Sequence, residues 1–463
     1  MLAIVPAFFF LLPLAGIPAS AAAAATTTTV PVTTAGNARS PYQLTLQIDH
    51  SSDAAVVIET GRQRRLYGKN ADLPQNIPAA AKLMTALVAC ERLSMSTLVT
   101  ISKVAAAADD NRQSPDGIAL DTGDKYPLEY LLLRLFFYNS DAAALAVAEQ
   151  LANVESDFVA LMNAKAKSLG LDNTVFLNCT GAPVYENASP SGSDTGEDAM
   201  QHSRQYTTPA DLARLVAYAC TVANFNRLIR MDEERMLLDG KTLVAMRNEI
   251  QHIWTLSEGR VTGAFYSETE GKTYMVAVGA VKDIKIVAVT AAGSPNSRYA
   301  DLETIFKGIE DNYVLSPLVE AGEKFTGEQE QTVDGELFGL VFKSTVYYVH
   351  PVDDMFVKST LRYNTFGPHS RPIQRSMTVG QVVFELLDGT TIAVDVCPDR
   401  QILSSISILD KALGELQENH NLYVILIVAS GLLMLLLLIQ VLSGLDKLFR
   451  LIQLLILEKR SRR

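Results

Sequence analysis

The sequence predicts an α+β fold, in which helices on an antiparallel sheet are followed by a small all-β domain and a C-terminal transmembrane helix. Three observations predict it. Helical and strand patterns alternate between residues 43 and 312, short strands and turns follow from 318 to 402, and residues 422–445 are apolar without a charge. A chain of 463 residues is long enough for two folded domains plus targeting segments.

The N-terminal region has the composition of a targeting segment. Residues 1–21 have an apolar core and end in small residues, which is typical of a signal peptide, although the first basic residue is Arg39. Residues 22–42 are rich in Thr and Ala and have little to bury, so we expect a disordered tether.

The first domain, residues 43–312, begins with strand patterns at 44–48 and 54–58 and a hairpin return at 62–67. Pro78 is well placed in the first turn of a helix over 78–93. A short strand at 97–102 is followed by a helical stretch over 127–150, broken near 138–140, and by a helix over 158–169.

A polar loop at 186–205 leads to a helix that has Thr208 as its N-cap and Pro209 in its first turn. Residues 274–280 and 285–291 are predicted strands, and 299–309 a helix. The second domain, residues 318–402, has strand patterns at 338–342, 345–349, 382–387 and 391–396, with an Asp388-Gly389 hairpin signal.

The C-terminal region is predicted to hold the chain in a membrane. Residues 403–421 form an amphipathic connector, and residues 422–445 would span ~36 Å as a helix, enough to cross a bilayer. Residues 446–463 form an amphipathic tail with six basic and two acidic residues. This charge places the tail in the cytoplasm and the main body outside the cell membrane.

Composition excludes several classes of function. The net charge is −11 and no basic patch is concentrated outside the tail, so we expect no nucleic-acid partner. Four scattered cysteines and six dispersed histidines have no metal-ligand spacing, so we expect neither a metal site nor a cofactor.

The predicted helix over 78–93 contains Ala79 and Lys82, three positions apart and therefore on one face. This is the geometry of an S-x-x-K motif, in which a lysine activates a serine nucleophile. In this chain the lysine is present and the nucleophile position is alanine. Taken alone, the A-x-x-K string carries little weight, because alanine and lysine are common in helices.

The surrounding sequence resembles the low-molecular-mass penicillin-binding proteins, the serine-type D-alanyl-D-alanine carboxypeptidase family. The resemblance covers nearly all of the predicted extracytoplasmic body. The strings that carry it are AAVVIETG at 54–61, LYGKNAD at 66–72, KLMTAL at 82–87, DAAALAVAE at 141–149, FLNCTG at 176–181 and YTTPADL at 206–212.

The resemblance implies a site built from three motifs, and all three are degraded in this chain. The second motif, S-x-N, aligns with Tyr138 to Ser140. The third, K-T-G, aligns with Val261, Thr262 and Gly263, and its cation is lost. Arg260 is adjacent, but neighbouring strand residues point to opposite faces, so it replaces the lost lysine only where the backbone is irregular.

Three functional hypotheses follow. The leading one is a catalytically inactive or impaired family member that binds peptidoglycan stem peptides or cell-wall synthesis proteins, because a methyl group at Ala79 cannot attack a carbonyl. The second is an active carboxypeptidase with a relocated nucleophile such as Ser140, and the third is a structural scaffold without a ligand. Lys82 is then the family base or a relic, and Tyr138 a base or a packing residue.

Overall fold

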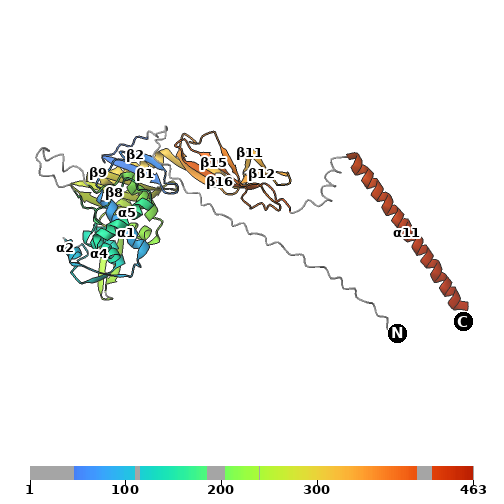
Figure 1. Cartoon of the computed structure of the whole chain (residues 1–463), viewed down its shortest axis with the longest axis horizontal. Coiled ribbons are helices and arrows are strands. Elements are labelled where there is room, and N and C mark those ends of the chain that lie inside the picture. The colour runs from blue at the N-terminus through green and yellow to red at the C-terminus, as the bar shows by residue number, and fades with distance from the viewer. Residues whose placement is uncertain (1–45, 110–114, 185–203, 239, 404–419, 462–463) are drawn as a thin grey trace, which may run out of the picture. The chain divides into compact units, whose positions relative to one another are not determined.

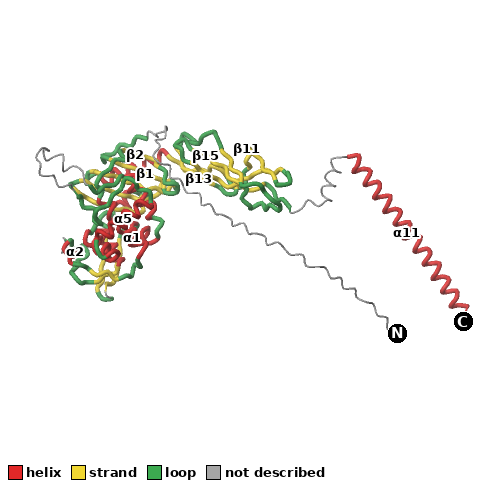
Figure 2. Tube along the Cα trace, viewed as in Figure 1, coloured by secondary structure: helices red, strands yellow, loops and turns green. Residues whose placement is uncertain are grey.

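The computed structural model describes residues 46–109, 115–184, 204–238, 240–403 and 420–461 (Figure 1). The predicted signal peptide, tether and most of the 186–205 loop and 403–421 connector lie outside these residues. Two folded domains, one with helices and one made of strands and loops, are distinguished in Figure 2.

The first domain is built on one antiparallel sheet of five strands in the order β2-β1-β9-β8-β7. The strands of this sheet are β1 (Ala54–Glu59), β2 (Arg65–Lys69), β7 (Val261–Thr269), β8 (Lys272–Val281) and β9 (Ile284–Gly293). Two small two-stranded sheets accompany it, β3 (Leu98–Thr100) with β4 (Lys125–Pro127), and β5 (Glu233–Leu238) with β6 (Thr242–Arg247).

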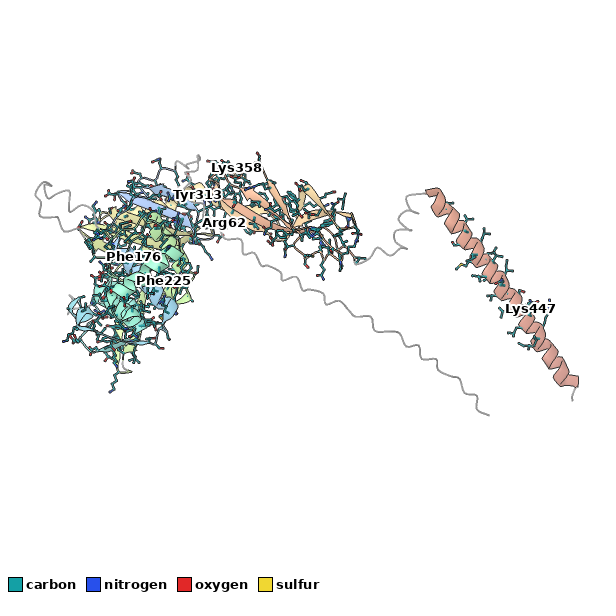
Figure 3. The ribbon with its side chains drawn as sticks, viewed as in Figure 1. Arg62, Phe176, Phe225, Tyr313, Lys358 and Lys447 are labelled. Atoms are coloured by element: carbon teal, nitrogen blue, oxygen red, sulfur yellow. The ribbon has the colours of Figure 1, made fainter. Side chains whose placement is uncertain are left out.

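Helices bury both faces of the main sheet. They are α1 (Pro78–Arg92), α2 (Lys103–Ala107), α3 (Leu128–Tyr138), α4 (Asp141–Ala152), α5 (Glu155–Ser168), α6 (Pro209–Ala219), α7 (Ala223–Ile229), α8 (His252–Leu256) and α9 (Arg298–Asn312). Strand β1 shows the period of two: Val56 packs in the larger core with α1, and Val57 packs in the smaller core with α9. Phe176 and Phe225 are fully buried in the larger core (Figure 3).

Most predicted elements of this domain are present. Thr208 accepts a hydrogen bond from Asp211 N as the N-cap of α6, and Pro209 opens that helix. The predicted break near 138–140 is real, because Asn139 adopts a left-handed conformation (φ 54°) between α3 and α4. Residues 46–48 are not a strand, in contrast to the expectation from their alternation, and the β5–β6 hairpin was not predicted.

The second domain contains strands alone among the described residues 313–403. Its strands are β10 (Tyr313–Val319), β11 (Lys324–Gln331), β12 (Leu337–Phe342), β13 (Val346–Pro351), β14 (Arg362–Thr365), β15 (Gly380–Glu385) and β16 (Thr391–Pro398). Five of them form a sheet in the order β11-β12-β16-β15-β14, and β10 pairs with β13. Strand β10 therefore runs through the predicted boundary at residues 313–317.

The C-terminal helix α11 (His420–Ser461) is continuous for 42 residues. Its segment Val428–Ile452 is long and apolar enough to cross a membrane by length and composition. The candidate span therefore begins later than the predicted 422–445 and includes the start of the predicted tail.

Candidate active site

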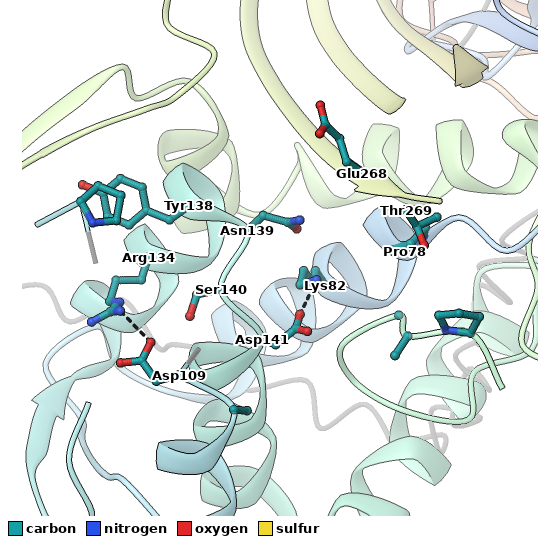
Figure 4. Close-up of a pocket in the computed structure, with 15 residues that line it drawn as sticks. Pro78, Lys82, Asp109, Arg134, Tyr138, Asn139, Ser140, Asp141, Glu268 and Thr269 are labelled. Atoms are coloured by element: carbon teal, nitrogen blue, oxygen red, sulfur yellow. Dashed lines mark hydrogen bonds and ion pairs between the residues drawn. The ribbon is translucent and has the colours of Figure 1, made fainter. Parts of the chain in front are cut away.

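A cavity of about 350 Å³ opens beside the first turns of α1 and α4 (Figure 4). Its walls come from five separate parts of the first domain, which only the fold brings together. The residues that line it are Pro78, Lys82, Ala108, Asp109, Pro115, Arg134, Tyr138, Asn139, Ser140, Asp141, Gly181, Ala182, Pro183, Glu268 and Thr269.

Ala79, the predicted nucleophile position, lies in the first turn of α1 and is fully buried. Its backbone N–H donates a hydrogen bond to Ser267 Oγ at 3.0 Å, and Ser267 is also fully buried. Ala79 is not among the residues that line the cavity, although its neighbours Pro78 and Lys82 are. A reacting carbonyl in the cavity therefore meets neither a hydroxyl nor a free N–H at this position.

Lys82 points toward α4 and forms an ion pair with Asp141 (Figure 4). The Nζ–Oδ1 distance is 2.6 Å, and the lysine side chain is 5% exposed whereas the aspartate side chain is 48% exposed. A general base must lie within hydrogen-bond reach of the proton that it removes. Here the Lys82 amine is already engaged by a carboxylate of the chain itself.

Tyr138, Asn139 and Ser140 lie beside Lys82 on the cavity wall, so the fold brings the first and second predicted motifs together. Burial raises the pKa of Tyr138 to about 12, although its hydroxyl accepts a hydrogen bond from Arg247 N, which lowers it. Ser140 Oγ accepts a hydrogen bond from Ala143 N as the N-cap of α4. That hydroxyl therefore has a structural task of the kind that stabilises a helix start.

Arg134 provides a second cation at the cavity and is 2% exposed. Its guanidinium contacts Asp109 at 3.1 Å and Asp116 at 4.0 Å, and it donates to the carbonyl of Ile118. Tyr130 donates a hydrogen bond to the same Asp116 at 2.8 Å. Both cations of the lining are thus neutralised by carboxylates of the chain itself.

The structure does not place the predicted substrate-binding residues at this cavity. Val261, Thr262 and Gly263 begin strand β7, whereas the cavity is lined by Glu268 and Thr269 at the end of the same strand. Ser267 is the residue of β7 that contacts Ala79. Gly263 is four residues away from it, which is about 13 Å along an extended strand.

The predicted substrate-binding residues Arg260, Val261 and Thr262 have partners elsewhere in the first domain. Val261 is buried and its N–H donates to Ser257 Oγ, while Thr262 Oγ1 accepts a hydrogen bond from Arg230. Arg260 is held by three carboxylates, those of Glu258, Glu303 and Glu310. The β7–β8 register does shift at this point, but the shift does not free Arg260 for a ligand. Among the described residues, no group of acidic, histidine and cysteine side chains is arranged to hold a metal ion.

Several residues of the site were not predicted from the sequence, among them Arg134, Asp141, Ser267 and Glu268. Asp141 had a usable signal, because it directly follows the predicted break at 138–140, and a carboxylate in the first turn of a helix is favourable. Ser267 had none, because its contact with Ala79 joins positions 188 residues apart. Glu268 pairs with Arg298 at 2.5 Å, which likewise depends on the tertiary fold.

Comparison with known proteins agrees with this architecture. A family model described as D-alanyl-D-alanine carboxypeptidase matches residues 38–293, more than half of the chain. D-alanyl-D-alanine carboxypeptidase DacF of Bacillus subtilis is 31% identical over 31% of this chain and 37% of its own length. D-alanyl-D-alanine endopeptidase of Escherichia coli is 28% identical, over 40% and 61% respectively. The chain thus spans between about a third and three fifths of the length of these curated relatives.

Longer matches are more distant. D-alanyl-D-alanine carboxypeptidase DacA of Escherichia coli is 23% identical over 75% of this chain and 81% of its own length. A peptidoglycan synthesis regulatory factor from Streptococcus pneumoniae has a TM-score of 0.60 at 18% identity, covering 77% of this chain and 100% of that one. Penicillin-binding protein 5 from Haemophilus influenzae has a TM-score of 0.55 at 18% identity, covering 77% and 98%. With the family model matched over most of the first domain, the chain belongs to the D-alanyl-D-alanine carboxypeptidase family.

Proposed function

We propose that this protein is a catalytically inactive or impaired D-alanyl-D-alanine carboxypeptidase relative of cell-wall metabolism. It binds peptidoglycan stem peptides in the cavity beside α1, or cell-wall synthesis proteins, without cleaving a peptide bond. The single observation that carries the proposal is the methyl group of Ala79 at the family's nucleophile position.

The loss of the nucleophile is large in energetic terms. Removing the attacking serine from well-studied serine hydrolases costs about 10⁶ in kcat and leaves only about 10³–10⁴ over the uncatalysed rate. The ion pair of Lys82 with Asp141 adds to this loss, because it engages the amine that the family mechanism would use as a base. Binding needs neither group as a nucleophile or base.

The cavity retains features of a binding site. It is open to solvent, and its lining includes the buried Oδ1 of Asn139 and Nε of Arg134, which have no hydrogen-bond partner among the described residues. The lining also presents the accessible side chains of Ser140, Asp141 and Glu268, whose oxygens can accept hydrogen bonds from a peptide.

The proposal includes the membrane. The span Val428–Ile452 anchors the chain, and the basic residues after it favour a cytoplasmic C-terminus with both folded domains outside. Single-pass topology with this orientation places the cavity where peptidoglycan is made.

The test uses the full chain in detergent micelles, with a fluorescent penicillin and with a pentapeptide ending in D-Ala-D-Ala. We expect no covalent label, no release of D-alanine, and saturable peptide binding. Lys82→Met weakens that binding at least tenfold, whereas Thr262→Val, far along β7 from the cavity, leaves it unchanged.

Other outcomes identify the alternative hypotheses. A covalent label that Ser140→Ala abolishes makes the protein an enzyme with a relocated nucleophile, since Ser140 lines the same cavity as Lys82. The first result contradicts the proposal. The absence of both label and peptide binding contradicts its stem-peptide part, and leaves a binder of cell-wall synthesis proteins or a scaffold.

A further inference from the structure

We propose that Ser267 blocks the acyl-transfer site, and that this block is independent of the missing hydroxyl at Ala79. Its hydroxyl occupies the backbone donor at the start of α1 and holds β7 against that helix. This inference rests on the proposed loss of activity and names the residue that would keep the site closed after the nucleophile is restored.

The backbone N–H of Ala79 is a donor of the kind that stabilises a reacting oxygen. The first N–H groups of a helix have no partner within the helix, and in acyl transfer such groups bind the developing oxyanion at 2.7–3.1 Å. In this chain the Ala79 N–H already donates to Ser267 Oγ at 3.0 Å. A substrate oxygen must displace that hydroxyl to gain the same bond.

The contact between Ala79 and Ser267 is buried and inaccessible to solvent. Ala79 and Ser267 are both 0% exposed, and neither lines the cavity. The next two strand residues, Glu268 and Thr269, do line it. Ser267 is therefore at the edge of the cavity, where β7 meets the first turn of α1.

Strand β7 is fixed in this position from its other side. Glu268 pairs with Arg298 at the start of α9, and β7 is bonded to β8 along most of its length. A shift of β7 away from α1 would disturb these contacts. The hydrogen bond between Ala79 N–H and Ser267 Oγ is thus held in place by the rest of the folded domain.

The consequence concerns the variant that restores the nucleophile. Ala79→Ser alone adds a hydroxyl at a fully buried position whose N–H is already used. We expect it to react slowly with a penicillin, and removal of the Ser267 hydroxyl to raise that rate. In the labelling step the new hydroxyl oxygen bonds to the β-lactam carbonyl carbon, the lactam C–N bond breaks, and the hydroxyl proton passes to the lactam nitrogen.

The experiment compares three full-length proteins with fluorescent penicillin: Ala79→Ser, Ala79→Ser/Ser267→Ala and Ala79→Ser/Ser257→Ala. Ser257 is a matched control, because it is also buried and its Oγ accepts a hydrogen bond from Val261 N at the opposite end of β7. One oxyanion-type donor is worth about 10²–10³ in rate. We expect the Ser267→Ala double variant to label at least tenfold faster than Ala79→Ser, and the Ser257→Ala double variant to match Ala79→Ser.

Two further variants keep the test decisive. Ser267→Gly in the Ala79→Ser background removes the same hydroxyl and replaces the alanine variant if that one does not fold, whereas Ser267→Thr keeps the hydroxyl and is expected to stay slow. Equal labelling of Ala79→Ser and the hydroxyl-free variants, including no labelling of any, overturns the role of Ser267. Labelling of the wild type bears instead on the proposed function.

Discussion

Lys82 Nζ lies 2.6 Å from Asp141 Oδ1, and this ion pair joins the first turns of α1 and α4 at the cavity. The lysine is almost fully buried and the aspartate is half-exposed. The residue that the family motif predicts to be a base is therefore paired with a carboxylate of the neighbouring helix.

The first prediction concerns the stability of this pair. Asp141→Asn leaves the buried Lys82 ammonium without its carboxylate. A fully buried pair broken on one side costs about 3–5 kcal/mol and an exposed pair about 0–1, so we expect an intermediate loss of about 1–3 kcal/mol in the free energy of unfolding. Urea denaturation measures it. The control is Asp121→Asn, at an exposed aspartate, which should change the free energy by less than about 0.5 kcal/mol.

The second prediction concerns the Arg134 network. Arg134→Met preserves much of the side-chain volume but leaves the buried carboxylates of Asp109 and Asp116 without their cation. We expect a loss of about 3–5 kcal/mol in the free energy of unfolding, measured in urea. Arg227→Met removes a cation from the exposed pair with Glu129 and should cost no more than about 1 kcal/mol. Equal losses in the two variants would show that the network at the cavity is not a buried ion pair.

The third prediction uses two glycines with similar backbone conformations. Gly181 has φ +85°, and a Cβ there would lie 2.4 Å from Pro78 O at the start of α1. Gly170 has φ +66° and open space around it. Gly170→Ala should lower the free energy of unfolding by about 1–2 kcal/mol, because alanine is strained in the left-handed conformation. Gly181→Ala has the same strain and must also displace α1.

Thermal unfolding of both glycine variants checks this difference. A midpoint for Gly181→Ala that falls no further than that of Gly170→Ala would mean that α1 moves aside without cost. Because Gly181 also lines the cavity, we expect its variant to lose ligand binding, whereas Gly170→Ala retains it.

The fourth prediction concerns pH. Burial raises the pKa of Tyr138 to about 12, so its phenol is neutral between pH 6 and 9 and cannot act as a base there. Peptide binding should show the same pH profile in Tyr138→Phe and in the wild type across this range, measured by fluorescence anisotropy. The loss of a titration step in the variant would contradict this assignment.

The same shift has a defined effect on stability. The folded pKa of Tyr138 is above the unfolded value of about 10, so the folded state binds more protons at high pH. Its contribution is fully present below pH 10 and is lost as the pH rises toward 12. The Tyr138→Phe variant should therefore lose less stability than the wild type over that interval.

The sequence by itself determined the family and most elements, and it predicted the loss of the nucleophile. Local signals suffice for these features: Pro78 opens α1, Thr208 caps α6, and Ala79 and Lys82 lie three residues apart on one helix. That residue 79 is alanine is given by the sequence, and no packing adds a hydroxyl to it.

Only the tertiary structure decided which part of β7 meets α1, and hence which residues form the site. A Thr-Gly string led to the prediction of Thr262 and Gly263, whereas the residues of β7 that line the cavity are Glu268 and Thr269. Which part of the strand lies there depends on pairing with β8 and packing on α1. The contacts of Ser267 with Ala79 and of Asp141 with Lys82 join residues 188 and 59 positions apart in the chain. Their chemistry arises from burial and proximity, which a linear pattern does not encode.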